Sequence, residues 1–197
     1  MAVTSIASNS PIDICAKALI LIGADPITSF SEGTTEALVS VNMYEDVARA
    51  SLVNTRWRFA TNQAVLNRLT AAPTGRYNYA YQLPTDNLMV HAITVTDLPI
   101  EYQIYGDKVY ADTSTSDVVI ADYSFRAGEE NWPSYFVIAV EYALATIFAS
   151  SIARDANLAN IMENQAQRAM AKARNLDAQQ QTTRKLTTSR FISERRS

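Results

Sequence analysis

Residues 133–150 read PSYFVIAVEYALATIFAS, and this stretch decides the fold of the chain. It opens on a proline, which suits the first turn of a helix, and its large apolar side chains then recur at helical spacing. Alanines fill most of the remaining positions, and Glu141 is the one charged residue. A helix that is apolar nearly all round must be covered on most sides. We therefore expect other helices of the chain to pack around it.

Three further helices are predicted from capping residues and apolar periodicity. The first follows Ser10-Pro11 and stops at Gly23, and the second follows Thr34 or Thr35 and runs to about Asn54. A fourth follows Asp155 and carries one apolar stripe from Leu158 to Leu176. We expect that stripe to pack on the helix at 133–150.

Between the second and third helices the pattern changes to short alternating runs rich in tyrosine and β-branched residues. Strands are predicted at residues 90–95, 101–105, 108–111 and 118–125. Gly106-Asp107 predicts a hairpin turn between the second and third of these strands. Because the strands cluster and do not alternate with helices, the sequence favours an α+β fold over an α/β fold.

The predicted architecture is a four-helix bundle core made of two helices, an antiparallel β insertion and two more helices, followed by an extended C-terminal tail. Residues 1–56 and 131–180 form the predicted helical domain, and residues 57–130 form the inserted β domain. Residues 181–197 lose the apolar period and form a predicted flexible, basic tail.

Composition narrows the classes of function. The chain has 197 residues and a formal net charge of −3, so it lacks the basic balance of a dedicated nucleic-acid-binding protein. Its single cysteine, Cys15, excludes an internal disulfide framework and is expected to be inert packing. No apolar run was expected to reach the ~18 residues that span a bilayer, so the protein is predicted to be soluble, unprocessed and free of membrane contact.

Catalytic signatures are scarce. A serine-type triad needs a histidine to move protons, and the only histidine, His91, lies in a predicted strand and is expected to be an ordinary sheet residue. One histidine and one cysteine, far apart in the sequence, cannot supply a zinc site without several carboxylates. No glycine-rich phosphate loop occurs among the five glycines. The adjacent acids Glu45-Asp46 and Glu129-Glu130 are expected to be solvated surface residues. The sequence therefore predicts no enzyme, no cofactor and no metal, with a small enzyme using an unrecognised carboxylate site as an alternative.

Several short motifs occur in an order that resembles one known family, the tail tubular protein A or head-to-tail adaptor proteins of short-tailed phages, over roughly residues 10 to 180. They are packing and turn motifs, and their joint order carries the resemblance. The motifs are Ile22-Gly23-Ala24-Asp25-Pro26-Ile27, Ser31-Glu32-Gly33, Arg56-Trp57-Arg58-Phe59, Tyr81-Gln82-Leu83-Pro84-Thr85-Asp86, Gly106-Asp107-Lys108-Val109-Tyr110 and the helix from Pro133 to Ala145.

The resemblance implies a structural virion protein at the phage head-to-tail junction, assembled in the host cytoplasm. Its subunits would form a homo-oligomeric ring of about twelve copies, built from head-to-tail contacts between two different surfaces of each copy. The ring would dock on the portal protein and present its other face to the tail nozzle protein. Genomic DNA would pass through its central channel without specific binding.

Candidate residues follow for each surface of such a ring. Alanines such as Ala139 and Ala143 beside Glu141 would let a neighbouring helix approach closely, or they would form the core of the bundle. Trp57 and Phe59 are candidates for the subunit interface, with core packing at the helix-to-sheet junction as the alternative. Asp107, Asp112 and Asp117 belong to an acidic stretch that would repel passing DNA if it lined a channel, or would form an ordinary solvated face.

The basic tail has three interpretations: a solubilising end, a DNA-binding arm, or a segment that orders on the portal. The family resemblance favours portal binding, and the main rival function is a DNA-binding module that uses this tail. The residues concerned are Arg184, Lys185, Arg190, Phe191, Ile192, Arg195 and Arg196.

Overall fold

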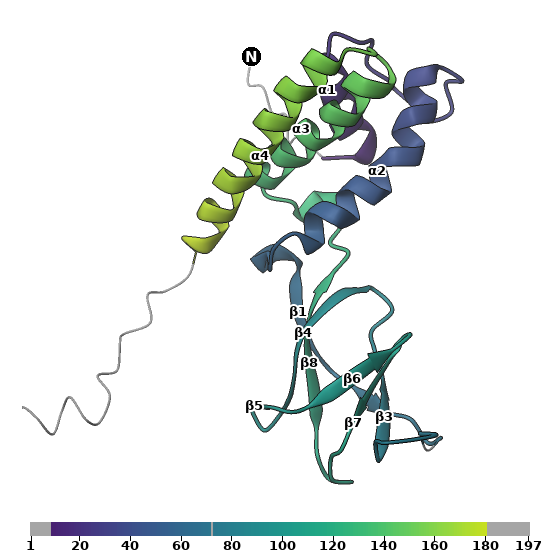
Figure 1. The fold of residues 1–197 in the computed structure, drawn as a ribbon, viewed down its shortest axis with the longest axis vertical. Coiled ribbons are helices and arrows are strands. Elements are labelled where there is room, and N and C mark those ends of the chain that lie inside the picture. The colour runs from purple at the N-terminus through teal and green to yellow at the C-terminus, as the bar shows by residue number, and fades with distance from the viewer. Residues whose placement is uncertain (1–8, 72, 181–197) are drawn as a thin grey trace, which may run out of the picture.

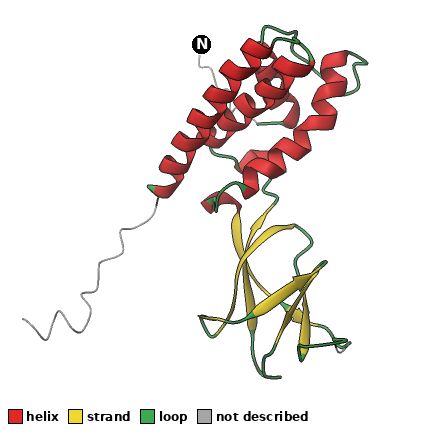
Figure 2. Cartoon of the chain, in the orientation of Figure 1, coloured by secondary structure: helices red, strands yellow, loops and turns green. Residues whose placement is uncertain are grey.

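The computed structural model describes residues 9–71 and 73–180, and Figures 1 and 2 show a helical part joined to a β part. The helical part contains α1 (Pro11–Leu21), α2 (Thr35–Val53), α3 (Ser134–Ser151) and α4 (Ala156–Ala178). The predicted caps are confirmed for α1, where Ser10 accepts from the Asp13 amide, for α2, which Thr34 caps, and for α4, which Asp155 caps. Each cap satisfies amides that the first helical turn leaves without a partner.

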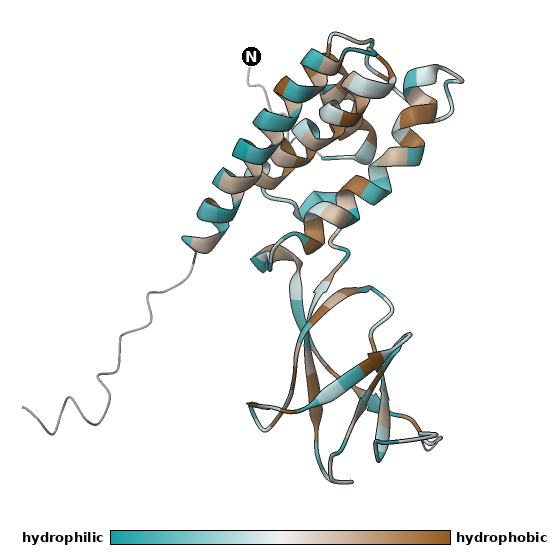
Figure 3. Cartoon of the chain, in the orientation of Figure 1, coloured by the Kyte–Doolittle hydropathy of each residue, from teal (hydrophilic) through white to brown (hydrophobic). Residues whose placement is uncertain are grey.

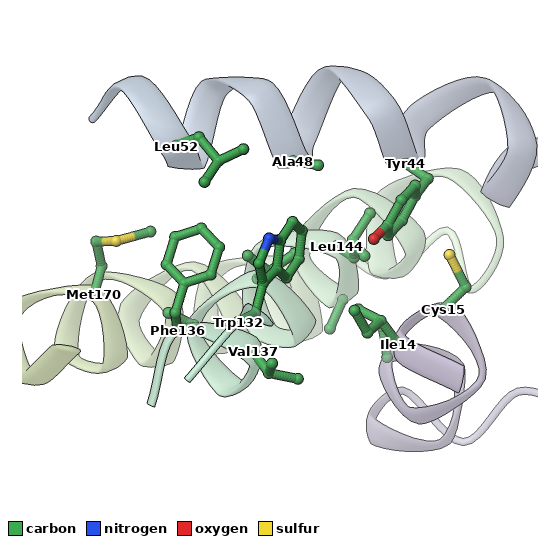
Figure 4. Packing of buried hydrophobic residues seen from close by; sticks show 14 of the residues in the cluster. Ile14, Cys15, Tyr44, Ala48, Leu52, Trp132, Phe136, Val137, Leu144 and Met170 are labelled. Carbon is green, nitrogen blue, oxygen red and sulfur yellow. The ribbon is translucent and has the colours of Figure 1, made fainter. Parts of the chain in front are cut away.

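The helix α3 lies at the centre of the helical part and contacts α1, α2 and α4. Phe136, Val140, Leu144 and Phe148 on α3 are fully buried. Figure 4 shows the close packing of this cluster, in which Tyr44, Ala48 and Leu52 of α2 cover α3 from one side and Ile14 and Cys15 of α1 lie at one end. The expectation that the helix at 133–150 is covered by the others is confirmed.

The apolar character of α3 also corrects one expectation. Ser134–Ser151 is long and apolar enough to cross a membrane by length and composition, although no run of that kind was expected. Eight of its residues are buried against the other helices, among them Phe136, Val140 and Phe148. Packing as a central helix accounts for this composition, because such a helix needs apolar side chains on most of its faces.

The β part contains eight strands in two antiparallel four-stranded sheets. Their bounds are β1 (Thr61–Val65), β2 (Asn67–Arg68), β3 (Tyr79–Gln82), β4 (Asn87–Val95), β5 (Leu98–Pro99), β6 (Tyr102–Tyr105), β7 (Lys108–Ala111) and β8 (Val119–Phe125). One sheet has the order β1-β8-β4-β5 and the other β2-β3-β7-β6. The chain passes from the first sheet to the second at Leu66, between β1 and β2.

The two sheets enclose a second hydrophobic core, separate from that of the helices. Ile93, Val119 and Ala121 contribute from the first sheet, and Tyr81 and Val109 from the second. The predicted hairpin at Gly106-Asp107 is confirmed between β6 and β7, and Gly106 has a φ of +62°, which a glycine adopts without the steric cost of a Cβ.

The predicted fold class, a four-helix bundle core with one antiparallel β insertion, is wrong. The observed chain has four α-helices and eight strands in two antiparallel sheets over its described residues. The physical reason lies in strands such as β3 and β7, whose Tyr81 and Val109 are buried in the core between the two sheets and not against the helices. The β region therefore buries its own apolar side chains and does not depend on a bundle to cover them.

Candidate assembly surfaces

Two polar clusters fix the helical part to the β part. In the first, Arg126, just after β8, donates through Nε and Nη2 to the Glu45 carboxylate of α2 at 2.9 to 3.3 Å. Its Nη2 also lies 2.6 Å from Glu129 Oε1, which accepts a further hydrogen bond from the Tyr44 hydroxyl at 2.8 Å. The Arg126 guanidinium lies over the Trp132 ring, 5.4 Å from its centroid. We call Arg126, Glu45, Glu129 and Tyr44 the Arg126 cluster.

The pKa values in this cluster follow from these contacts. Hydrogen bonds from Arg126 hold the pKa of Glu45 below its ordinary value. Burial favours the neutral form of Glu129, yet the bonds from Arg126 and Tyr44 outweigh it and lower the pKa of Glu129. Burial would likewise lower the pKa of Arg126, but the two carboxylates raise it. All three groups are therefore charged at neutral pH, and the ion pairs hold the junction together.

The second cluster joins the end of α4 to the segment before β1. The buried Asp177 accepts from the Arg58 amide at 3.2 Å and from the Tyr135 hydroxyl at 3.0 Å. Arg58 Nε donates to the Asp177 carbonyl oxygen at 2.8 Å. Burial and the neighbouring Asp177 carboxylate raise the pKa of Tyr135 to about 12. This cluster fixes the C-terminal end of α4 beside the β part.

Neither cluster was predicted from the sequence, which treated Glu45 and Glu129 as solvated acids. One signal was present: Arg126 and Lys108 are the only two cations in the acidic stretch 86–130, and Arg126 lies at the boundary between strand and helix. A lone arginine at such a boundary indicates an ion pair with more than one acid.

The predicted interface residues occupy different environments. Trp57 is fully buried in the helical core, where its indole Nε1 donates to the Ser51 carbonyl at 2.9 Å, so it offers no surface to a neighbouring subunit. Phe59 is half-buried and stacks with Phe136 at a centroid distance of 4.9 Å. Glu141 pairs with Lys17 of α1 at 3.4 Å, and burial raises its pKa. These three residues hold the helical part together internally.

Ala143, by contrast, is partly exposed and forms the floor of a surface groove together with Ala139, whose side chain is itself fully buried in the helical core. The groove has a volume of about 560 Å³ and lies between α2 and α4, with α3 beneath it. We call it the alanine groove, and its apolar lining comprises Val47, Ala50, Ala139, Ala143, Ile147, Ala166 and Met170. Arg174, Gln167 and Asn54 provide its polar lining. Because the α3 residues at the bottom of the groove have short side chains, the groove has space for a side chain of another molecule.

A second apolar surface lies near the start of α2, beside the loop that precedes it. Leu38 and Val41, both on α2, are 63% and 48% exposed. Together with Phe30 they line a shallow hollow of about 340 Å³, and we call these three residues the α2 patch. In Figure 3, hydrophobic segments recur along α2, whereas the turns of α4 are largely hydrophilic. Ala37, Ser40 and Tyr44 form the buried face of α2, so Leu38 and Val41 lie outside the helical core.

The predicted channel acids do not form one cluster. Asp107 accepts from Gln82 Nε2 at 2.9 Å in the β6–β7 turn, and this bond lowers its pKa. Asp112 accepts from the Asn78 amide, and Asp117 from the Ser114 amide, both at 2.7 Å. Because β7 separates Asp107 from Asp112, the two lie roughly 16 Å apart along the strand. Asp107 and Asp117 stabilise turns, and Asp112 links the segment before β3 to the end of β7.

Within the described residues, no three His, Cys, Asp or Glu side chains come together as a metal site would require. His91 Nε2 lies 2.8 Å from Ser124 Oγ, and desolvation, followed by the charge of Arg56, lowers the pKa of this histidine. The predicted portal-binding residues, from Arg184 to Arg196, lie outside the described residues.

No protein-family model matches the sequence, and comparison with curated proteins finds no relative. A functional proposal therefore depends on the sequence motifs and on the two apolar surfaces of the helical part.

Proposed function

We propose that this chain is a structural subunit of a phage virion, a head-to-tail adaptor that forms a ring on the portal and supports assembly of the tail nozzle. In this role the ring surrounds a channel through which the genome passes, and the chain carries out no catalysis. The basic residues from Arg184 to Arg196 would contact the portal, and the β part or the free ends of the helices would meet the nozzle.

The observation that carries the proposal is the presence of two different apolar surfaces on one helical domain, the alanine groove and the α2 patch. A subunit of a cyclic ring needs two distinct surfaces, because each copy contacts one neighbour with one surface and the other neighbour with the second. Leu38 and Val41 expose large apolar side chains that the fold of a single chain leaves in water. The ordered motifs that resemble adaptor proteins support the same role.

The test is the mass of the purified full-length chain, measured by light scattering at moderate salt, alone and after mixing with the portal of the same phage. We expect a large ring, either free or on the portal. A chain ending at Gln181 should keep its fold and lose portal binding. A full-length monomer that ignores the portal and binds DNA with steep salt dependence would replace the proposal with the DNA-binding alternative.

A further inference from the structure

The two apolar surfaces lie on opposite flanks of the same helix. Leu38 and Val47 are nine residues apart on α2, as are Val41 and Ala50. At 3.6 residues per turn, nine residues make about two and a half turns, so each pair points in opposite directions. Val47 and Ala50 line the alanine groove, and Leu38 and Val41 belong to the α2 patch. One helix therefore presents a different apolar surface to each side.

The charges around the two surfaces are opposite in sign. Residues 24–44, which include the α2 patch, contain three carboxylates and no lysine, arginine or histidine: Asp25, Glu32 and Glu36. The half of α4 beside the groove, residues 164–176, contains Arg168, Lys172 and Arg174 and no acid. Among the described residues none of these three cations forms an ion pair, and neither does Glu36. Complementary charge of this kind steers and orients association.

We propose that the α2 patch of one copy docks in the alanine groove of the next copy, and that this is the repeating contact of the ring. The inference depends on the proposed function and assigns its subunit interface to particular residues. Leu38 and Val41 fill the space above Ala139 and Ala143, and the acidic start of α2 faces the basic half of α4. Arg174, which lines the groove, is the cation nearest to the docked patch.

The geometry also constrains the ring. The patch and the groove are separated by about 13 Å along the axis of α2, at 1.5 Å per residue. In a ring, all copies lie at the same height along the ring axis, and the α2 patch of one copy meets the alanine groove of the next. The patch and the groove of each copy must therefore lie at the same height along that axis. The helix α2 is therefore inclined to that axis and not parallel to it.

The first experiment uses two full-length variants that each block one surface. Leu38→Glu places a charge in the α2 patch, and Ala50→Glu places one at the exposed edge of the groove. Each variant alone should remain monomeric where the wild type forms rings. An equimolar mixture should stop at a heterodimer of two 21.8-kDa chains, because only one intact patch and one intact groove remain. Ile161→Glu, at a position 53% exposed on α4 and outside both surfaces, is the matched control and should assemble normally.

A second experiment detects the contact even when a single interface is weak. A Leu38→Cys, Ala50→Cys double variant, treated with a short bis-maleimide, should give a ladder of cross-linked multimers, and neither single variant should extend beyond a dimer. Rings formed by Leu38→Glu or Ala50→Glu, or the absence of a ladder from an assembled double variant, would overturn this interface while leaving the adaptor role standing. A wild-type chain that forms no ring, alone or with portal, would overturn both.

Discussion

Removing the Arg126 side chain tests whether the ion pairs at the junction stabilise the fold. Arg126→Ala leaves Glu129, whose side chain is 14% exposed, without its cationic partner, and it frees Glu45, which is 46% exposed. Breaking a buried pair by removing one partner costs about 3–5 kcal/mol, and an exposed pair contributes under about 1 kcal/mol. Because one carboxylate is buried and the other half-exposed, we predict a loss of about 2–3 kcal/mol, which corresponds to a fall of roughly 5–10 °C in Tm.

Urea unfolding followed by tryptophan fluorescence measures this loss directly, because both tryptophans are buried in the helical core and Trp132 lies beneath Arg126. Arg49→Ala is the matched control. Arg49 also contacts Glu45, at 2.6 Å, but its side chain is 55% exposed, so its removal should cost less than about 0.5 kcal/mol. Equal losses for the two variants would refute the role given to the Arg126 cluster.

The same variant should change the dependence of stability on pH. The pKa values of Glu45 and Glu129 are lowered in the folded protein, so their contribution is present above their unfolded value, near 4.3, and is lost as pH falls through the folded value. The wild type should therefore lose more stability than Arg126→Ala between pH 6 and pH 3, and the difference between them should narrow. A difference that stays constant to pH 3 would contradict this assignment.

Three further results are expected from simpler variants. Phe136→Ala should lower the free energy of unfolding by about 3–5 kcal/mol in urea titrations, because it empties the centre of the helical core. Gly106→Val should destabilise the β part by about 1–2 kcal/mol in far-UV circular dichroism, whereas Gly75→Val, at a glycine without positive φ and with open space around its Cβ position, should change little. The Cys15 thiol, with a pKa raised by burial to about 12, should react with a thiol reagent at pH 8 only after unfolding.

The sequence predicts the helices well because each of them has a local signal. Ser10, Thr34 and Asp155 mark helix starts through hydrogen bonds within one turn, and such bonds depend little on distant residues. The Gly106-Asp107 turn is predicted for the same reason. Local chemistry was sufficient at these positions.

The β part was misjudged because its organisation depends on contacts between distant residues. The strands β1 and β2 carry polar and mixed residues such as Thr61-Asn62-Gln63, and nothing local in them indicates a strand. They are strands because β1 pairs with β8, which lies far along the chain, and β2 pairs with β3. The apolar periodicity of the sequence therefore did not predict the second sheet or the second hydrophobic core.

The sequence likewise predicted one of the candidate surfaces and missed the other. Ala139 and Ala143 were predicted from composition, and the structure places them in the floor of the alanine groove. The α2 patch was missed, because the spacing of Leu38 and Val41 is that of a buried face, and only the packing of Ala37 and Tyr44 shows which side of α2 faces inward. The Arg126 cluster joins residues about eighty positions apart, a separation that no local pattern reveals.

The central position of α3 determines the order in which the protein can fold during synthesis. The helices α1 and α2 leave the ribosome early, but the helix that they cover begins at Ser134, about eighty residues after α2 ends at Val53. At 5–20 residues per second, this delay lasts about 4–16 s. The whole β part emerges within that interval and has its own core, so it can fold while the apolar faces of α1 and α2 still wait for α3. Those faces are then the surfaces of the nascent chain that a chaperone would protect.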